Sequence, residues 1–242
     1  MRTSEILLQH RAVWQRKPVL RALYTTWYEE IASHLRRGRT LEVGGGTGNL
    51  KEFAPQVICT DVVELPWLDL VADAQYLPLA SEALANIVLF DALHHIENVR
   101  LFFDEAVRVL RPTGRIVIMD PYISWLSWPV YHFVHPEPVD FTDDPLRLRP
   151  PRAERMPFDS NQAVATTLFE RNYDAFRRQY PQLTKLVHRR LAFFAYPLSG
   201  GFDRPSLLSL PLVRPLLAME RALGFLDRFL AFRILVVLEK RG

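Results

Sequence analysis

The sequence predicts an α/β fold, in which a doubly wound, mostly parallel sheet is covered by helices on both faces. Two observations lead to this prediction. Between residues 38 and 120, short apolar segments alternate with segments of helical period, which is typical of repeated strand–helix–strand units. A glycine-rich turn at residues 44–48 follows the first apolar segment, where nucleotide-binding sheets place their ligand. The 242 residues are enough for one such domain with an insertion, or for two small domains.

The N-terminal residues are predicted to form two helices, which Pro18 divides within residues 3–36. Proline suits the first turn of a helix because its missing N–H would have no partner there. From Leu20 to Leu35, apolar residues recur with the period of a half-buried helix, and Gly38 then ends it. We therefore expect residues 1–37 to cap the sheet.

The segment 38–120 is predicted to contain five strands. A helix is expected to start within Thr47–Phe53, directly after the glycine turn, and an amphipathic helix spans Asn98–Leu110. Pro112-Thr113-Gly114 predicts a turn. The strands are expected at Arg39–Val43, Gln56–Asp61, Leu68–Val71, Asn86–Phe90 and Arg115–Met119.

The alternation stops near residue 121. Residues 121–157 contain eight prolines and many aromatic side chains, too many for a flexible linker. They predict an ordered, irregular insertion, and residues 160–180 predict a helix. The remaining elements are a strand at Leu191–Tyr196, helices at 206–229 broken at Pro211 and Pro215, and a last strand at Ala231–Leu238.

Composition and charge narrow the function classes. The single cysteine, Cys59, lies in an apolar run and excludes an intramolecular disulfide. The net charge of +3 comes from scattered arginines without a basic stripe, so no nucleic-acid partner is indicated. Charged residues interrupt the most apolar stretch, Leu207–Leu238, and the N-terminus is not a signal peptide. A cytoplasmic protein is expected.

The glycine turn is a candidate ligand site. Gly44, Gly45, Gly46 and Gly48 allow a tight turn and a close approach of the backbone to a ligand, and the helix expected next would direct free N–H groups toward it. A purely structural turn is the alternative. The spacing does not fit G-x-G-x-x-G, and the Lys-Ser/Thr pair of the P-loop is absent.

Two acidic residues follow the next two strands. Asp61 lies 17 residues after Gly44, where a carboxylate can accept hydrogen bonds from both ribose hydroxyls. Asp73 precedes Ala74 and can accept from an adenine amino group. Taken singly, each of them could also end a strand for structural reasons.

Several ordered motifs resemble one family. They are Ala72-Asp73-Ala74, Leu77-Pro78, Asp91-Ala92-Leu93-His94-His95-Ile96 and Glu105–Arg115. Together with the glycine turn and Asp61, they resemble class I methyltransferases that use S-adenosylmethionine, of the ubiquinone/menaquinone-biosynthesis-like branch (methyltransferase type 11). The resemblance covers about residues 38–120. The family more often has glycine where Thr113 stands, which affects the stiffness of the turn and not the chemistry.

The resemblance implies the fold and the cofactor contacts. It implies a single Rossmann-like methyltransferase domain over residues 1–242, with a seven-stranded sheet and an antiparallel last strand. Its parts are a cofactor-binding core (38–120), a lid for the acceptor (121–180) and the C-terminal part of the sheet (181–242). S-adenosylmethionine is the implied cofactor, and its implied contacts are Glu42 and the glycines of the turn for methionine, Asp61 and Val62 for ribose, Asp73 and Ala74 for adenine, and backbone groups of Phe90 and Asp91 for the methionine end.

The methyl acceptor is less well defined by the sequence. His94 and His95 are the nearest candidates for a catalytic base, although either could simply pack and bond to the backbone. No metal site is predicted, because His132 and His135 lack a firm third ligand. The C-terminal tail resembles a bacterial subgroup associated with cell-surface polysaccharide or lipid-linked intermediates.

Three hypotheses about function follow. The first is methyl transfer, chiefly to an oxygen of a small or lipid-linked acceptor, with at most peripheral membrane association. The second is a non-catalytic protein of the same fold that binds S-adenosylmethionine. The third, a nicotinamide-dependent oxidoreductase, is disfavoured by the glycine spacing. The sequence makes no prediction of oligomeric state.

Overall fold

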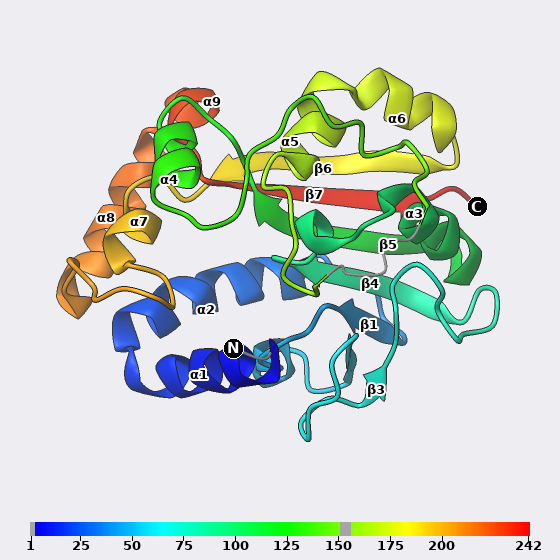
Figure 1. The fold of residues 1–242 in the computed structure, drawn as a ribbon, viewed down its shortest axis with the longest axis horizontal. Coiled ribbons are helices and arrows are strands. Elements are labelled where there is room, and N and C mark those ends of the chain that lie inside the picture. Colours follow the sequence, from blue (N-terminus) through cyan, green and yellow to red (C-terminus); the bar gives the residue numbers. More distant parts are fainter. Residues whose placement is uncertain (1–2, 151–155) are drawn as a thin grey trace.

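Within the described residues, 3–150 and 156–242 of a computed structural model, seven strands form one sheet in the order β3-β2-β1-β4-β5-β7-β6 (Figure 1). Strands β1 to β5 are parallel, and β7 is antiparallel to both of its neighbours. The predicted fold class is confirmed, including the antiparallel last strand. The strands are β1 (Thr40–Val43), β2 (Val57–Asp61), β3 (Leu70–Val71), β4 (Leu84–Phe90), β5 (Leu110–Pro121), β6 (Leu183–Leu191) and β7 (Arg233–Lys240).

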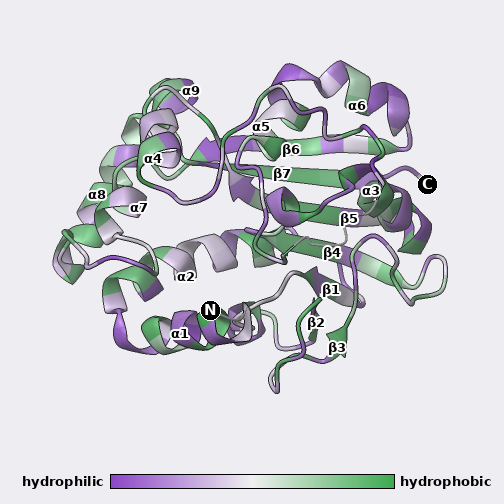
Figure 2. Cartoon of the chain, in the orientation of Figure 1, coloured by the Kyte–Doolittle hydropathy of each residue, from purple (hydrophilic) through white to green (hydrophobic). Residues whose placement is uncertain are grey.

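The central strands are buried on both faces. Every residue of β4 is buried, as expected for a parallel strand covered by helices on either side. Ile87 and Leu89 belong to one apolar cluster, whereas Val88 and Phe90 belong to a second one on the opposite face. Figure 2 shows the same hydrophobic character along β5 and β7. Because strand side chains alternate between faces, the two clusters hold helices on both sides of the sheet.

The helices cover both faces of the sheet. The predicted N-terminal helices are confirmed, and Pro18 begins the second one. The α-helices of the described residues are α1 (Thr3–Arg16), α2 (Pro18–Ser33), α3 (Val99–Val109), α4 (Ser127–Phe133), α5 (Val164–Thr166), α6 (Tyr173–Gln179), α7 (Ala195–Ser199), α8 (Leu210–Ala222) and α9 (Asp227–Leu230). A π-helical turn, Thr167–Arg171, interrupts the single helix that was predicted for residues 160–180.

The helix predicted at Thr47–Phe53 is wrong. This segment forms only one 3₁₀ turn, Asn49–Glu52, preceded by Gly48 in the left-handed region with φ of 72°. Pro55 follows within three residues of the turn and leaves no room for a longer helix. The glycine turn therefore has no helix dipole behind it.

The strand predicted at Leu191–Tyr196 is also wrong. Strand β6 ends where that prediction begins, Ala192 adopts a positive φ of 63°, and α7 follows. Because β6 is an edge strand with exposed residues such as Leu186 and Arg189, its hydropathy does not identify it.

Two further predictions for the C-terminal half and β5 need correction. Pro211 lies in the first turn of α8 and Pro215 lies inside it, so neither breaks the helix. The turn predicted at residues 112–114 lies inside β5, where the pairing with β4 shifts register and Thr113 adopts a φ of 62°. Among the described residues, no helix is long and apolar enough to cross a bilayer.

Candidate active site

A cavity of about 1480 Å³ lies at the carboxyl ends of β1, β2, β4 and β5. The chain runs from β1 outward to β3 and then returns to β4 on the other side of β1. This reversal is the switch point at which open α/β sheets bind their ligands. Residues 130–145 of the proline-rich insertion contribute to the cavity wall opposite the glycine turn.

The glycine turn follows β1 and packs tightly against its neighbours. A Cβ atom on Gly44, whose φ is 66°, would lie 2.7 Å from the Cβ of Ala92, and one on Gly45 would lie 2.2 Å from Cys59 Sγ. The N–H of Gly45 donates to the carbonyl of Thr60 at 2.8 Å. Glycine is therefore required here by packing as well as by any ligand. Gly44, Gly45 and Gly46 line the cavity, whereas Gly48 packs against Trp67.

Glu42 lies buried at the end of β1 and lines the cavity. Cys59 Sγ donates to its Oε2 atom at 3.0 Å. Burial raises the pKa of Glu42 to about 7, although the hydrogen bond from Cys59 opposes the shift. The carboxyl group can thus gain or lose a proton near neutral pH.

Asp61 and Asp73 lie farther along the same wall. Asp61 accepts hydrogen bonds from the N–H groups of Gly46 at 3.0 Å and Val63 at 3.2 Å, and burial raises its pKa. Asp73 accepts from the N–H of Gln75 at 2.9 Å. Within residues 3–150 and 156–242, neither these carboxylates nor Glu42 forms an ion pair. Among the described residues, these three carboxyl groups on one side of the cavity therefore have no cationic side chain paired with them.

The neighbours of these residues also reach the cavity. Ala74 is buried beside Asp73, whereas Val62, next to Asp61, is about half exposed. Phe90 and Asp91, at the end of β4, lie on the opposite side of the switch point. All predicted cofactor residues except Gly48 thus line one cavity.

Asp91 is held by a buried arginine. Its φ of 53° lies in the left-handed region, and its carboxylate accepts two hydrogen bonds from the guanidinium of Arg233, one of them 2.8 Å long. Arg233 is 1% exposed, and its guanidinium lies 4.6 Å from the ring centres of both Trp27 and Tyr196. Arg233 was not predicted from the sequence, where it stands directly before the apolar run 234–238 of β7.

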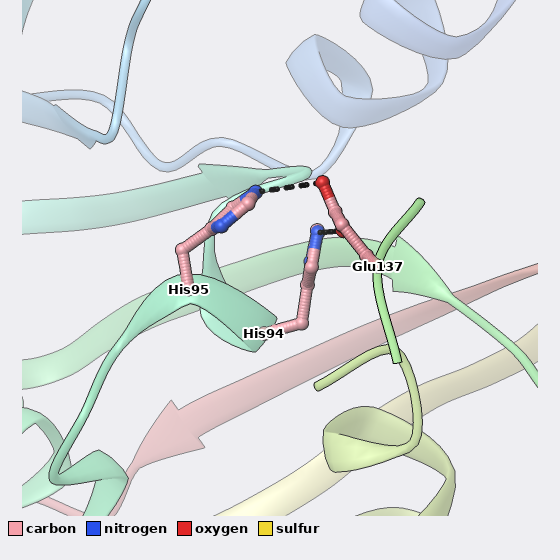
Figure 3. A group of neighbouring side chains, drawn as sticks. All are labelled: His94, His95 and Glu137. Atoms are coloured by element: carbon pink, nitrogen blue, oxygen red, sulfur yellow. Dashed lines mark ion pairs between the residues drawn. The ribbon is translucent and has the colours of Figure 1, made fainter. Parts of the chain in front are cut away.

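His94 and His95 follow β4 on a 3₁₀ turn, Leu93–His95, and meet a carboxylate from the insertion (Figure 3). His94 Nδ1 lies 2.9 Å from Asp120 Oδ1, and its Nε2 lies 3.4 Å from Glu137 Oε2. His95 Nε2 lies 3.9 Å from Glu137 Oε1. Four side chains from three segments thus converge, and three of them, His94, His95 and Glu137, line the cavity.

The two histidines have opposite protonation preferences. Burial disfavours a charged imidazole at His94, but Asp120 and Glu137 outweigh it and raise its pKa to about 10. Burial and the neighbouring His94 lower the pKa of His95 to about 3. Burial would raise the pKa of Glu137, but its bond to His94 prevails and lowers it to about 2. At neutral pH, His94 is charged and His95 is neutral.

Asp120 and Glu137 were not predicted as site residues. A signal existed for Asp120, which follows the apolar run Ile116–Met119 of β5 as Asp61 follows that of β2. Glu137 stands between Pro136 and Pro138 in an irregular segment, where no periodic pattern predicts which way a side chain faces. Its place in the site depends on the tertiary fold.

Comparison with known proteins agrees with this geometry. Residues 41–118, which extend from β1 into β5, match the methyltransferase domain family. Together with the seven-stranded sheet, this match makes residues 41–118 similar to methyltransferase domains of the class I, Rossmann-like type.

A curated relative matches a larger part of the chain. The chain is 31% identical over 154 residues to phthiotriol/phenolphthiotriol dimycocerosates methyltransferase 1 of Mycobacterium ulcerans (strain Agy99). The matched stretch covers 61% of this chain and 53% of the relative, so the chain spans about half the length of that relative.

Solved structures show the same fold at low sequence identity. A S-adenosylmethionine-dependent methyltransferase from Thermotoga maritima, described as a possible histamine N-methyltransferase, has a TM-score of 0.59 and 15% identity, over 99% of this chain and 97% of its own. Geranyl diphosphate C-methyltransferase from Streptomyces coelicolor A3(2) has a TM-score of 0.50 and 14% identity, over 92% and 81% of the two chains.

Proposed function

We propose that the protein is an S-adenosylmethionine-dependent methyltransferase that acts in the cytoplasm. The observation that carries this proposal is the unpaired acidic wall of Glu42, Asp61 and Asp73. S-adenosylmethionine has no phosphate, and its sulfonium and ammonium groups would bring positive charge to Glu42. Its ribose hydroxyls and adenine amino group can donate hydrogen bonds to Asp61 and Asp73, so it complements this wall, which we call the cofactor wall. The phosphates of a dinucleotide would meet these carboxylates, and the single 3₁₀ turn after Gly48 offers no helix N-terminus to hold them.

The residues on the wall suit the parts of the cofactor in order. Glu42 and the backbone of residues 44–46 would hold the methionine portion, and Asp61 with Val62 the ribose. Asp73 and Ala74 would hold the adenine, and backbone groups of Phe90 and Asp91 the methionine end. The bound cofactor supplies the activated methyl group, so the protein chiefly orients the acceptor and excludes water.

The acceptor that we propose is an oxygen of a small or lipid-linked molecule. At about 1480 Å³ the cavity exceeds the usual range of about 300–1,000 Å³ for one small ligand, which leaves room for an acceptor beside the cofactor. The Mycobacterium ulcerans relative is named for a dimycocerosate substrate, which favours a lipid-linked acceptor. A role in cell-surface polysaccharide synthesis and the ubiquinone/menaquinone-like branch stay predictions from the sequence.

We call the described residues of the segment 121–180 that line the cavity, together with His94 and His95, the acceptor wall. Tyr131, Val134 and Glu137 from this segment line the cavity, as do His94 and His95. We therefore propose that residues 121–180 bind the acceptor, and that the two histidines act on the acceptor rather than on the cofactor.

Peripheral contact with a membrane would suit a lipid-linked acceptor. Trp125 and Phe225 are 82% and 78% exposed, and the ring of Trp125 lies 5.9 Å from that of Phe229 on α9. Helices α4, α8 and α9 lie together at one end of the molecule (Figure 1). The exposed surface of α8 carries Arg214 and Arg221, while its acidic residue, Glu220, is buried. Exposed aromatic and basic residues favour an anionic membrane surface.

Calorimetric titration tests the cofactor assignment. The purified protein should bind S-adenosylmethionine and S-adenosylhomocysteine and should not bind NADH. If the protein binds NADH and binds neither S-adenosylmethionine nor S-adenosylhomocysteine, the proposal is overturned. Binding of the sulfur nucleotides without methyl transfer to any hydroxylated lipid or sugar acceptor would instead support a non-catalytic binding protein.

A further inference from the structure

We propose that His94, His95 and Glu137 bind one divalent transition-metal cation, best matched by Zn²⁺, at the acceptor wall of the cavity. Cation binding stands independently of methyl transfer, whereas the catalytic role given below rests on the proposed function. Neither the residue pattern nor the comparisons assign a metal to these positions. The case rests on the spacing of the ligand atoms, on the residues that orient them, and on charge.

The spacing of the ligand atoms suits one small cation. One nitrogen or oxygen atom from each residue lies within 4.8 Å of the others. Ligands bound tetrahedrally to Zn²⁺ at about 2.0–2.1 Å lie about 3.4 Å from one another. His94 Nε2 lies 3.4 Å from Glu137 Oε2, which already has this value, and His95 Nε2 lies 3.9 Å from the other oxygen, Oε1. A small shift of the side chains would bring both imidazoles and one carboxylate oxygen, or both oxygens, around one cation. Figure 3 shows both imidazoles directed toward the one carboxylate.

Further residues orient two of the three ligands. Asp120 is fully buried and pairs with Nδ1 of His94, so it directs Nε2 toward Glu137. Gln162 donates from Nε2 to Oε2 of Glu137, and the N–H of Asn161 donates to the carbonyl of His94 at 3.0 Å. Carboxylates and amides behind the ligands are typical of metal sites, because they fix the tautomer and ring orientation of a ligating histidine.

Charge also favours a dication. The cluster brings two carboxylates, Asp120 and Glu137, into a largely buried space. A divalent cation would replace the proton on His94 Nε2, and it would then balance both carboxylates while both imidazoles are neutral. Two imidazoles and one carboxylate favour Zn²⁺ or a similar transition metal over Mg²⁺, which prefers oxygen ligands throughout.

An open coordination position would face the cavity, because all three ligands line it. Three protein ligands with an open position are typical of catalytic rather than structural zinc sites. A hydroxyl group of the acceptor bound there would become more acidic. The hydroxyl group would release its proton to water, and its oxygen would attack the methyl carbon of S-adenosylmethionine. The bond between this carbon and the sulfur would break, which leaves S-adenosylhomocysteine with an uncharged sulfur.

Zinc titration of metal-free protein tests the proposal. We expect one Zn²⁺ per chain by calorimetry, in competition with a chelating dye. Glu137→Gln and His95→Ala should each weaken binding at least 100-fold. The matched control is His132→Ala, because His132 is exposed, stacks on Trp128 at 4.7 Å between ring centres and is not part of the cluster. This control should leave the affinity unchanged.

Co²⁺ absorption supplies a second measurement that does not depend on affinity alone. The intense visible bands of tetrahedral or five-coordinate Co²⁺ should appear in the wild type and in His132→Ala, and should be lost in Glu137→Gln. Circular dichroism verifies that each variant is folded. Equal zinc affinity in wild type and Glu137→Gln, or an equal loss in His132→Ala, would overturn the proposal.

The same samples separate this inference from the proposed function. If S-adenosylhomocysteine binds and zinc does not, the metal site is wrong and the methyltransferase assignment remains. If zinc binds and neither sulfur nucleotide does, the metal site remains and the cofactor assignment is wrong.

Discussion

The two walls of the cavity contain similar acidic residues in different surroundings. On the cofactor wall, Glu42 and Asp61 meet only neutral donors, namely the thiol of Cys59 and backbone N–H groups. On the acceptor wall, Glu137 contacts His94, and the fully buried Asp120 contacts the same histidine from outside the cavity lining. A carboxylate without a protein cation is costly to bury, so the cofactor wall suits a cationic ligand. The acceptor wall is partly neutralised by its own side chains.

The largest expected effect concerns the ion pair that lies between the two walls. In Asp91→Asn, the buried guanidinium of Arg233 loses its partner, whereas asparagine still tolerates the positive φ at this position. We expect the free energy of unfolding to fall by about 3–5 kcal/mol, measured by urea denaturation.

The double variant Asp91→Asn/Arg233→Met is the control for this prediction. It should recover part of the loss, because it removes the uncompensated charge as well. A loss below about 1 kcal/mol in Asp91→Asn would show that the arginine is not dependent on this partner.

The dependence of stability on pH tests the surroundings of Glu42 on the cofactor wall. The pKa of Glu42 is about 7 in the folded protein, above its ordinary value of 4.5. Between these values the folded state holds more protons than the unfolded state, so this group makes the protein less stable as the pH rises, up to about 7. From about pH 5 to pH 8, the wild type should lose roughly 2–3 kcal/mol more stability than Glu42→Gln, measured by denaturation at each pH. If the free energy of unfolding changes with pH in the same way in both proteins, Glu42 is not a buried carboxyl group without a cationic partner.

Asp61 tests whether the cofactor wall binds the ribose. Asp61→Ala should weaken binding of S-adenosylhomocysteine by about 1–3 kcal/mol, the scale for losing hydrogen bonds to a charged group. Calorimetry measures the affinity. The matched control is Asp174→Ala, because Asp174 is exposed on α6 and pairs only with the exposed Arg177 in the described structure. Unchanged affinity in Asp61→Ala would show that the ribose contact is misplaced.

The same contrast explains what the sequence could predict. Strands β2 and β4 repeat a local pattern, in which a mainly apolar run ends at an acidic residue, Asp61 or Asp91, at the ligand-binding edge. The acceptor wall has no such pattern. Glu137 reaches His94 from 43 residues farther along the chain, through a segment without regular period.

The errors in secondary structure have physical causes of the same kind. Strand β6 has too many exposed and charged residues for its hydropathy to identify it. After the glycine turn, the alternation of strands and helices predicted a helix that the left-handed Gly48 and the nearby Pro55 limit to one turn. The correction matters for function, because a long helix at this turn would have favoured a phosphate-bearing ligand.

The smallest effect expected per residue concerns the surface formed by α4, α8 and α9, outside both walls. Each arginine near an anionic bilayer contributes about 1 kcal/mol, so Arg214→Ala/Arg221→Ala should lower co-sedimentation with phosphatidylglycerol-containing vesicles by about tenfold or more. Trp125→Ser should lower it further, because an exposed aromatic ring then no longer enters the interface. The matched control is Arg177→Ala on α6, which lies away from these helices in Figure 1 and should not change binding. Equal binding of all variants would mean that these exposed side chains do not bind a membrane. Equal binding of the wild type to neutral phosphatidylcholine vesicles would mean that the two arginines contribute no electrostatic attraction.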